Sequence, residues 1–361
     1  MAKILHTESS MGWGGQEIRI LQESLGMMKR GHRVVIAAPA RSSIFKRADE
    51  AGISVLPAYF QKHNPFSIVS TASIINRVKP DIVNTHSSSD SWVSALAVKL
   101  SGHGAGIIRT RHLSTPISKS FTSRLIYEKL PDSVMTTGEQ IRQNMIHDNG
   151  FSASKIISIP TGIDLERFNP EKVEPAFRSN NFSVGMVGVL RSWKGHVYFL
   201  EAINKIKNKI PEMSFYIAGD GPQHENIEGL ISKLSLNDMV FMLGHREDVP
   251  GILASLDVVV HPSYANEGVP QSILQAFAME KPVIASDTGA IKEVLIDGKT
   301  GLLIEPKNAD ALAGKIIELY YKPEMRAGFG KEGRLIVEND YSMGSMLDKI
   351  EALYEKILND V

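Results

Sequence analysis

The sequence predicts an α/β protein built from two doubly wound domains that face a cleft. Short apolar segments alternate with helical segments along the chain, which is the signature of parallel strands joined by crossover helices. The length of 361 residues suits two domains of ordinary size. Between two series of strands lies a segment rich in Pro, Gly and Asn, residues 159–170, which we interpret as the linker.

The first domain is expected to span residues 1–170. An amphipathic helix, Gln16–Arg30, ends before Gly31, a residue type that favours the C-terminal cap of a helix. The expected strands are short and apolar: Lys3–His6, Val34–Ala38, Ser54–Pro57, Ile82–Thr85, Gly106–Thr110 and Ser133–Thr136.

The second domain is expected to span residues 171–342. A final amphipathic helix, Met343–Leu358, can pack on either domain, so residues 343–361 can return to the first. The expected strands of the second series are Phe182–Val189, Ser214–Ala218, Val240–Leu243, Val258–His261, Val283–Ser286 and Gly301–Ile304.

Composition narrows the function classes. The chain has no cysteine, which excludes disulfides and thiolate chemistry and suits a reducing cytosol. No run of eighteen apolar residues occurs, and Met1–His6 reads as a strand rather than a signal peptide. A soluble or peripheral membrane protein is therefore expected.

The net charge of zero hides an asymmetry. Residues 1–170 carry 20 Lys and Arg against 13 Asp and Glu, so the remainder carries 20 against 27. This balance predicts either a face for anionic partners or an ordinary solvated surface. The basic side chains gather at Arg109, Arg111, Lys119, Arg124 and Lys129.

The segment around Glu267 is the most informative part of the sequence. Val258–His261 reads as a buried strand, and Pro270 suits the first position of a helix. Glu267 is therefore expected past the carboxyl end of a strand and at a helix N-terminus, where open α/β sheets bind ligands and backbone N–H groups attract anions. A carboxylate there suits the hydroxyls of a sugar beside a bound phosphate. Gln275 follows within the helix.

Two loops are candidates for binding a diphosphate. Gly12–Gly15 follows the first strand, and its glycines allow backbone N–H groups to approach an anion, although a plain turn is the alternative. NAD is disfavoured because Glu17 occupies the third glycine position of a dinucleotide fingerprint. In the second loop, Arg191 and Lys194 precede a helix and suit phosphate oxygens, with solvated surface as the alternative.

Two further positions lie beyond strand ends. Gly244-His245 can pass under a flat base, and His112 is either structural or faces the cleft. The sequence contains no Asp-x-Asp and no His/Cys cluster, so no metal site is expected. The absence of Gly-x-Ser-x-Gly argues against a hydrolase.

The order of these motifs resembles the retaining glycosyltransferases of family 4, which have GT-B architecture. The motifs are the glycine loop, His112, Gly-Ile-Asp-x-x-x-Phe from Gly162, Lys194-Gly195, Gly-Asp-Gly-Pro from Gly219 and Glu-Gly-x-Pro-x-x-Ile-Leu from Glu267. The resemblance runs from about Ile4 to Tyr354. The segment Gly-Val-Leu-Arg-Ser-Trp-Lys-Gly-His is similar to a bacterial branch that builds lipopolysaccharide and other surface glycans.

The resemblance implies two Rossmann-like domains, an acceptor held by the first and a UDP- or GDP-sugar held by the second. It implies a lipid-linked or lipopolysaccharide acceptor at the cytoplasmic face of the inner membrane, peripheral contact through the basic first domain, and no nucleic acid. It also implies a reaction with neither cofactor nor metal, in which the acceptor attacks from the front face and the departing phosphate helps to deprotonate it. The positioned reactants and the stabilised leaving group then supply the catalysis.

The resemblance also implies roles for individual residues. His112 and Glu267 would be catalytic: His112 would contact the donor sugar, and Glu267 would hold its hydroxyls. The donor would be bound at Gly14, Gly15, Arg191, Lys194, Gly244, His245, Gly268, Val269 and Gln275.

This chain departs from the family pattern at three positions. Val189 replaces the usual Arg after Gly188, so Arg191 is expected to supply that charge. A common Gly-Gly turn is Gly289-Ala290. Gln275 replaces a glutamate that accepts hydrogen bonds from ribose, and it keeps an acceptor oxygen but not the charge. Altered nucleotide binding is therefore expected rather than loss of catalysis.

Two alternatives stay open. A sugar-nucleotide epimerase of GT-B fold would recruit Glu267 and Glu293 as acid and base. A non-catalytic sugar-nucleotide binder is suggested only by Gln275.

Overall fold

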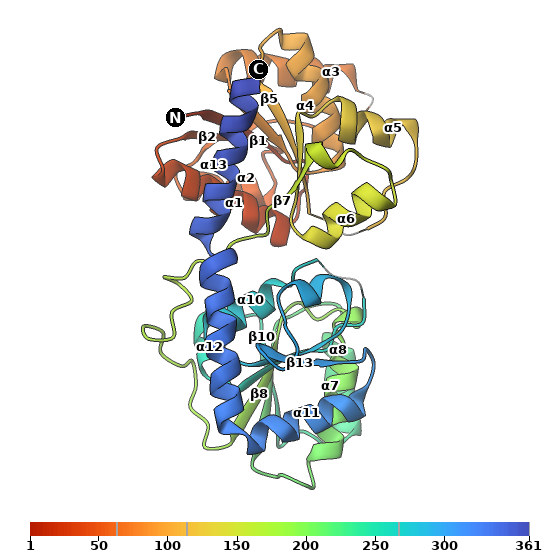
Figure 1. Cartoon of the computed structure of the whole chain (residues 1–361), viewed down its shortest axis with the longest axis vertical. Coiled ribbons are helices and arrows are strands. Elements are labelled where there is room, and N and C mark those ends of the chain that lie inside the picture. Colours follow the sequence, from red (N-terminus) through yellow and green to blue (C-terminus); the bar gives the residue numbers. More distant parts are fainter. Residues whose placement is uncertain (63, 113–114, 266–267, 361) are drawn as a thin grey trace. The chain divides into compact units, whose positions relative to one another are not determined.

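The chain folds into two compact units, each built around one parallel sheet (Figure 1). The computed structural model describes residues 1–62, 64–112, 115–265 and 268–360. The first unit is Met1–Thr161 with Gly344–Val361, and the second is Gly162–Met343. The predicted α/β class with two doubly wound domains is confirmed.

The predicted linker lies partly within the second unit. Residues 162–170, predicted from sequence to close the first domain, belong to Gly162–Met343. The reason is a backbone exchange: Ile163 N–H donates to the carbonyl of Tyr341 (2.7 Å), and Met343 N–H donates to the carbonyl of Ile163 (2.8 Å). Gly162 is required there, because a Cβ would lie 2.7 Å from the Met343 Cα.

In the described part of the first unit, seven parallel strands have the order β3-β2-β1-β4-β5-β6-β7. Apolar residues predominate in them because helices cover both faces of a parallel sheet. The six predicted strands are present, and the three-residue β7 was not predicted. The bounds are β1 Lys3–Thr7, β2 Arg33–Ala38, β3 Ser54–Pro57, β4 Ile82–Thr85, β5 Gly106–Arg111, β6 Ser133–Thr136 and β7 Ile156–Ser158.

The helices of this unit begin at residues that suit helix starts. Asn64 accepts a hydrogen bond from the Phe66 N–H (3.0 Å) and Pro65 follows it at the first position of α3. The bounds are α1 Gly15–Lys29, α2 Ser43–Glu50, α3 Pro65–Val78, α4 Ser88–Ser101, α5 Phe121–Arg124, a π-helical turn η1 Leu125–Lys129, α6 Glu139–His147 and a 3₁₀ turn η2 Ala153–Lys155.

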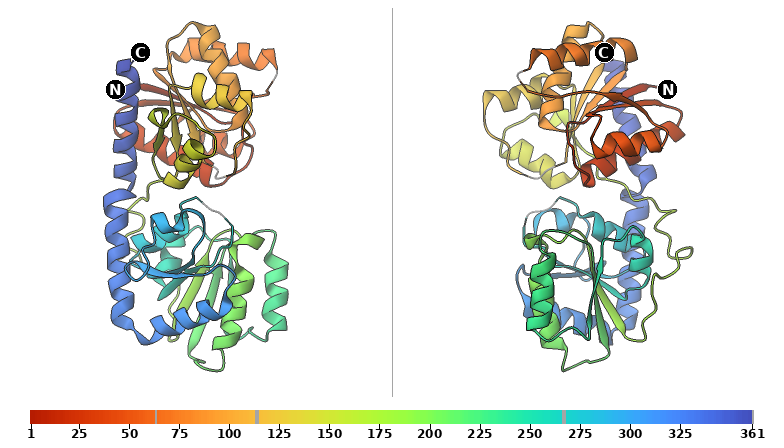
Figure 2. Two further views of the ribbon diagram at one scale, coloured as in Figure 1. Left: turned by 45° about the vertical axis from the view of Figure 1, so that its right-hand side comes forward. Right: turned by 180° about the vertical axis from the view of Figure 1, so that it is seen from behind.

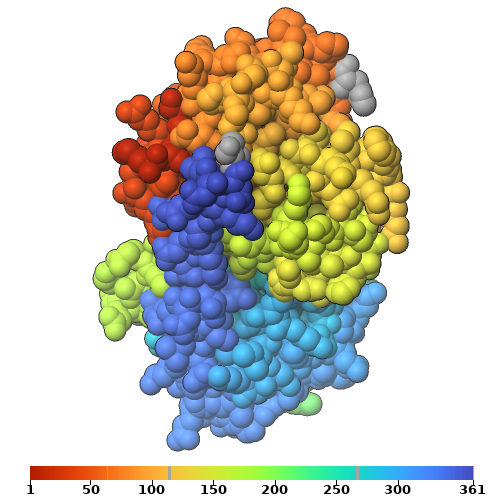
Figure 3. Space-filling model, turned by 45° about the horizontal axis from the view of Figure 1, so that its top comes forward, coloured from red at the N-terminus to blue at the C-terminus, as the bar shows by residue number. Residues whose placement is uncertain are grey.

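The last helix, α13 (Met343–Asp360), packs on the first unit, beside α1 and the sheet (Figures 1 and 2). Leu347 fits against Gly26, where a Cβ would come within 2.5 Å, and Ile357 fits against Gly106, where a Cβ would come within 2.3 Å. Arg30 forms an ion pair with Glu351 at the edge of this contact. Figure 3 shows the dark-blue C-terminal segment lying against the red N-terminal surface.

In the described part of the second unit, six parallel strands have the order β10-β9-β8-β11-β12-β13. One buried cluster, including Phe199, Ile217 and Leu312, and another, including Val259 and Phe277, form its core. The strands are β8 Phe182–Val187, β9 Met213–Ala218, β10 Val240–Gly244, β11 Val258–His261, β12 Val283–Ser286 and β13 Gly301–Ile304.

The helices and turns of the second unit connect these strands. Strand β8 ends at Val187, two residues before the predicted end, because Gly188 takes a φ of +154°. The bounds are η3 Ser192–Lys194, α7 His196–Ile206, α8 His224–Lys233, α9 Val249–Ala254, α10 Gln271–Ala278, η4 Gly289–Glu293, α11 Ala309–Tyr321 and α12 Pro323–Asp340.

Both sheets reverse their strand order at one internal point. In the first unit the reversal lies between β1 and β4, and in the second between β8 and β11. In open α/β sheets, ligands bind in the crevice outside the carboxyl ends of the strands at such a point. Among the residues described, no helix is both long and apolar enough to cross a membrane.

Candidate functional site

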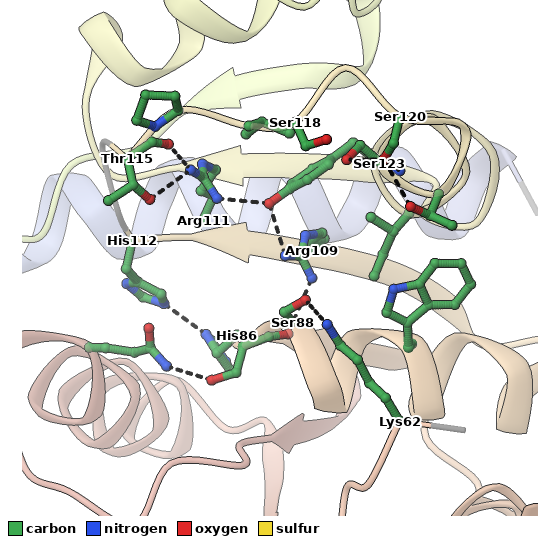
Figure 4. Close-up of a pocket in the computed structure, with 18 residues that line it drawn as sticks. Lys62, His86, Ser88, Arg109, Arg111, His112, Thr115, Ser118, Ser120 and Ser123 are labelled. Carbon is green, nitrogen blue, oxygen red and sulfur yellow. Dashed lines mark hydrogen bonds between the residues drawn. The ribbon is translucent and has the colours of Figure 1, made fainter. Parts of the chain in front are cut away.

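Three histidines form a chain of hydrogen bonds across the carboxyl ends of neighbouring strands. His6 lies in β1, His86 follows β4 and His112 follows β5. His6 Nδ1 lies 2.9 Å from His86 Nε2. His86 Nδ1 lies 3.0 Å from His112 Nε2 (Figure 4). The two pairs of rings have centroid separations of 5.2 Å and 5.3 Å. These hydrogen bonds therefore fix the position and tilt of the His112 ring.

The three histidines are held neutral. Burial lowers the pKa of His6, and burial with neighbouring positive groups lowers the pKa values of His86 and His112 well below the ordinary range. A neutral imidazole has one donor and one acceptor nitrogen, so the hydrogen bonds must all run in the same direction along the chain.

The direction of the hydrogen bonds between the histidines follows from Glu23. Its Oε1 lies 3.9 Å from His6 Nε2, and a carboxylate favours an N–H on the nitrogen that faces it. We therefore assign the protons to Nε2 throughout, so that His112 donates to His86 and His86 donates to His6. This assignment leaves His112 Nδ1 as a hydrogen-bond acceptor.

Glu23, which lies beside His6, is itself held by other buried side chains. It receives hydrogen bonds from Asn84 (3.3 Å) and from the Tyr354 hydroxyl (3.2 Å), and it lies 3.8 Å from Arg19. Glu23, Arg19 and Asn84 are fully buried, and Tyr354 nearly so. Helices α1 and α13 thus both contribute to holding the histidines.

The sequence predicted His112 but not the residues that support it. A signal was available, because in the first unit a histidine stands near or just past the ends of β1, β4 and β5. What the sequence lacks is the order of the strands, which brings β1, β4 and β5 side by side.

A cavity of about 630 Å³ opens beside His112. Arg109 and Arg111 from β5 face it (Figure 4). Tyr127 from η1 also lines it. Hydroxyl groups supply much of the remaining lining: Ser87, Ser88, Ser118, Ser120, Thr122 and Ser123.

The predicted glycine loop lies at the start of α1. The Gly14 N–H donates to Glu17 Oε2 (2.8 Å), and Gln16 lines the cavity. A Cβ on Gly15 would meet no atom within 4 Å, and one on Gly14 would meet only Glu17 at 3.5 Å. Glycine at these positions is therefore not required by the packing of this unit.

In the second unit, the loop with Arg191 and Lys194 is held under the end of β11. Gly195 has a φ of +81°, and a Cβ there would lie 1.9 Å from the carbonyl oxygen of Pro262. The carbonyl of Trp193 accepts hydrogen bonds from the Ser263 hydroxyl and the Tyr264 N–H, both at 2.9 Å.

The two cations of this loop differ in their surroundings. Arg191 is exposed, with its guanidinium 5.1 Å from the centre of the Trp193 ring, and Lys194 is half-buried. His196, the first residue of α7, is buried; burial and the charge of Lys194 lower its pKa to about 4. The positive charge of this loop therefore comes from Arg191 and Lys194 rather than from His196.

The remaining predicted donor residues lie near two strand ends. Gly268 and Val269 precede α10, and Gln275 is half-buried within it. Glu267 lies outside the described residues. Pro270 is the N-cap and Gln271 begins the helix, which corrects the predicted start by one residue.

The predicted base-binding pair ends β10. Gly244 has a φ of +66°, a conformation that favours glycine, and its carbonyl accepts the Gly219 N–H (2.8 Å). His245 follows it and is exposed. Within the described residues no group of three or more His, Asp or Glu side chains could hold a metal ion.

Two family profiles match consecutive parts of the chain. Residues 13–167 match Glycosyltransferase Family 4, and residues 168–336 match Glycosyl transferases group 1. Together they cover both doubly wound units apart from the first strand and the last helix.

Individual proteins are similar over most of the chain. The UDP-Gal:α-D-GlcNAc-diphosphoundecaprenol α-1,3-galactosyltransferase of Escherichia coli is 28% identical over 306 residues, which cover 80% of this chain and 78% of that protein. A glycosyltransferase from Rickettsia africae is 25% identical with a TM-score of 0.90 over 99% of both chains. HepE of Anabaena, solved with UDP-glucose, shares the fold with a TM-score of 0.83 at 20% identity, covering 99% of this chain and all of its own.

Proposed function

The chain belongs to the family 4-type glycosyltransferases of GT-B architecture, and from this premise we propose that it transfers a sugar with retention of configuration from a UDP- or GDP-sugar to a lipid-linked or lipopolysaccharide acceptor. The observation that carries this proposal is His112, held in one orientation beside a cavity of about 630 Å³. The E. coli relative named above acts on a diphosphoundecaprenol acceptor, which supports a role in bacterial surface-glycan synthesis.

We assign the donor to the second unit. Arg191 and Lys194 would meet the charge of the diphosphate, as a guanidinium fork and a point charge respectively. Gly244 and His245 would take the base, and Gln275 would accept from the ribose with a neutral oxygen. Gly14 and Gly15 would admit the diphosphate, because no neighbouring atom of their own unit fills the space that a Cβ would take at Gly15.

The reaction then depends on positioning and on charge. A neutral His112 cannot serve as an acid, but its Nδ1 can accept a hydrogen bond from a hydroxyl of the donor sugar. Glu267 would hold other hydroxyls of the same sugar. The departing diphosphate would be stabilised by Arg191 and Lys194 and would take the proton of the attacking acceptor hydroxyl, with no metal.

The acceptor is assigned to the first unit, and peripheral membrane contact to part of its basic cluster. Lys119, Arg124 and Lys129 are exposed, and Phe121 between them is 80% exposed. Such a mixture of cations and an aromatic ring suits an anionic membrane surface. Arg109 and Arg111, which belong to the same basic cluster in the sequence, are not assigned to this surface because they line the cavity.

A donor-panel assay for released UDP or GDP tests the assignment. Glu267→Ala and Lys194→Ala should each lower turnover by about a hundredfold or more, as expected when a group that stabilises transition-state charge is lost. Lys331→Ala, at an exposed position of α12, is the matched control and should match the parent. Full turnover in both site variants would contradict the proposed site.

Two further measurements separate the alternatives. NMR of the donor without any acceptor would show conversion by an epimerase but not by a transferase. Tight donor binding without turnover on any acceptor would indicate a binder.

A further inference from the structure

In the cavity of the first unit, two arginine side chains donate hydrogen bonds to the hydroxyl of the same tyrosine. Arg109 Nη2 donates to the Tyr127 hydroxyl at 2.9 Å, and Arg111 Nη1 donates to the same oxygen at 2.8 Å. The Arg109 guanidinium also lies 4.4 Å from the centre of the Tyr127 ring. Arg109 is 5% exposed, so one of these cations is almost completely removed from water.

The hydrogen bonds in this cluster leave donors unused. The Tyr127 oxygen accepts from both arginines, so its own proton is available to another acceptor. Arg109 further donates to the Ser87 carbonyl (3.2 Å), while its Nε is buried without a partner. Arg111 donates to the Thr115 carbonyl. Each guanidinium has five N–H groups, so both retain donors beyond these bonds.

The neighbouring acids form hydrogen bonds with other groups, although Arg109 acts on Asp90 electrostatically. Within the described part of the chain, neither arginine forms an ion pair with a carboxylate. Asp90 accepts from the N–H groups of His86 and Ser87, both at 2.8 Å, and Glu8 accepts from the Ser87 hydroxyl at 2.6 Å.

Burial raises the pKa of Glu8 and raises that of Asp90 well above its ordinary value, so both carboxyls resist becoming negative. Burial also opposes ionisation of Tyr127, but Arg109 and Arg111 outweigh it and lower the pKa of the phenol. The lowered pKa of the phenol reflects the positive charge of the two guanidinium groups beside it.

Buried charge without a counterion is strongly unfavourable, which indicates that the cavity is completed by an anion. Three features describe that anion. Planar guanidinium forks match the oxygens of a phosphate or a carboxylate. Lys62, whose Nζ lies 2.6 Å from the Ser88 hydroxyl, adds a cation at the rim. The many hydroxyl groups and the Trp92 ring in the lining suit a sugar attached to that anion.

We propose that Arg109, Arg111 and Tyr127 bind a phosphate ester of the acceptor, either a phosphate or a diphosphate on the first sugar. This rests on the proposed glycosyl transfer, and it deepens it by naming the acceptor as an anionic sugar phosphate. The volume of about 630 Å³ is large enough for a sugar and its phosphate groups.

Calorimetric titration with inorganic pyrophosphate tests the anion site without requiring turnover. The titration is made with saturating UDP or GDP present, so that the donor site is occupied. Arg111→Gln and Tyr127→Phe should weaken pyrophosphate binding about ten- to a hundredfold, because each removes a hydrogen bond to a charged group. Arg77→Gln, at an exposed position of α3, is the matched control and should bind as the parent does.

Each outcome decides the proposal. Equal binding by Arg111→Gln, Tyr127→Phe and Arg77→Gln would overturn it, as would complete loss of pyrophosphate binding when the nucleotide is present. Tyr127→Phe keeps the ring over Arg109, so it serves if Arg111→Gln fails to fold. Thermal melting of each variant identifies that case.

A second titration separates an ester from a free ion. A short-chain prenyl diphosphate should bind at least as tightly as pyrophosphate; if only the inorganic ion binds, the cavity does not hold an acceptor ester and the proposal fails. Failure of the proposed transfer is a different result, because it would appear as absent turnover while the cavity still binds pyrophosphate.

Discussion

The two units share one strand order but use their switch points differently. In the first unit the crevice between β1 and β4 is filled by buried polar side chains, from His6 and His86 down to Glu23. At the equivalent point of the second unit, backbone packs against backbone: Gly195 follows β8 and meets the carbonyl of Pro262, which follows β11. The same topology therefore supports a side-chain network in one unit and a close backbone contact in the other.

The glycines show the difference most clearly. A Cβ on Gly219 would lie 1.9 Å from the Gly188 carbonyl oxygen, and Gly219 has a φ of +147°, so the fold of the second unit requires glycine there. A Cβ on Gly15 in the first unit would touch nothing. The loop of the second unit therefore needs glycine to fold, whereas the loop of the first unit has open space at its glycine.

Lowering the pH should destabilise the first unit more than the second, and this is the largest difference that we expect between them. Burial lowers the folded-state pKa values of His6, His86 and His112 in the first unit and of His196 in the second, the last to about 4 from 6.5. Below pH 6.5 the unfolded chain binds protons at these histidines that the folded chain does not bind. The stability that is present above pH 6.5 is therefore lost as the pH falls. For His196 alone the loss is roughly 3 kcal/mol by pH 4, and three histidines should make the loss larger in the first unit.

Urea unfolding at a series of pH values measures this effect. The slope of the unfolding free energy against pH should exceed the value for a single proton, and His196→Gln should reduce it by about one proton. His147→Gln, on the exposed end of α6, should leave it unchanged. A slope of one proton or less in the parent protein would show that the histidine chain is not held neutral.

Gly219→Ala should lower the free energy of unfolding by about 3 kcal/mol, because it combines a backbone conformation that alanine avoids with overlap onto the Gly188 carbonyl. Denaturant unfolding measures the change. The matched control is Gly229→Ala within α8, where a Cβ has open space and alanine should stabilise the helix by about 0.5–1 kcal/mol. Equal stability of the two variants would contradict the close contact.

Tyr354→Phe should lower the free energy of unfolding by about 1–3 kcal/mol, since it removes one donor from the buried Glu23 and leaves the ring in place. Thermal unfolding measures the loss. Tyr321→Phe, at a position that is 67% exposed on α11, is the control and should differ little from the parent. If Tyr354→Phe matched its control, the network below the histidines would not stabilise the unit.

Gly15→Ala should change the free energy of unfolding by less than about 0.5 kcal/mol, because the added methyl meets no atom and lies at a helix start. If the loop covers the donor diphosphate, nucleotide affinity should fall although stability does not. Calorimetry with UDP and GDP measures it. Reduced stability together with unchanged affinity would reverse the contrast between the two glycine loops.

The strands were predictable because each is a short apolar run closed by Gly, Pro or a polar residue. Strand β7 was missed since Ile156-Ile157-Ser158 is too short to show a pattern. Gly219 and Gly221 lie in a turn after a buried strand. Both are structural, because a Cβ on Gly221 would lie 2.7 Å from the Leu190 carbonyl oxygen and one on Gly219 would overlap the Gly188 carbonyl.

The site was less predictable, because side-chain partners depend on strand order. His6 and His86 stand 80 positions apart in the sequence and meet only because β4 pairs with β1. Arg109 and Arg111 offered a clearer signal: they are two residues apart in a strand and therefore lie on one face, which Tyr127 also approaches. The roles assigned to Glu267, Arg191, Lys194 and Gln275 stay predictions.

The return of α13 to the first unit has a consequence for synthesis in the cell. Tyr354, which supports the buried Glu23, emerges from the ribosome only after all of residues 162–343. At about 5–20 residues per second, roughly 10–40 seconds separate the first sheet from its last helix. During that interval Gly26 and Gly106 lack the apolar side chains of Leu347 and Ile357 that cover them. The second unit is one continuous segment that ends at Met343, so all of its residues are synthesised before the first unit receives its last helix.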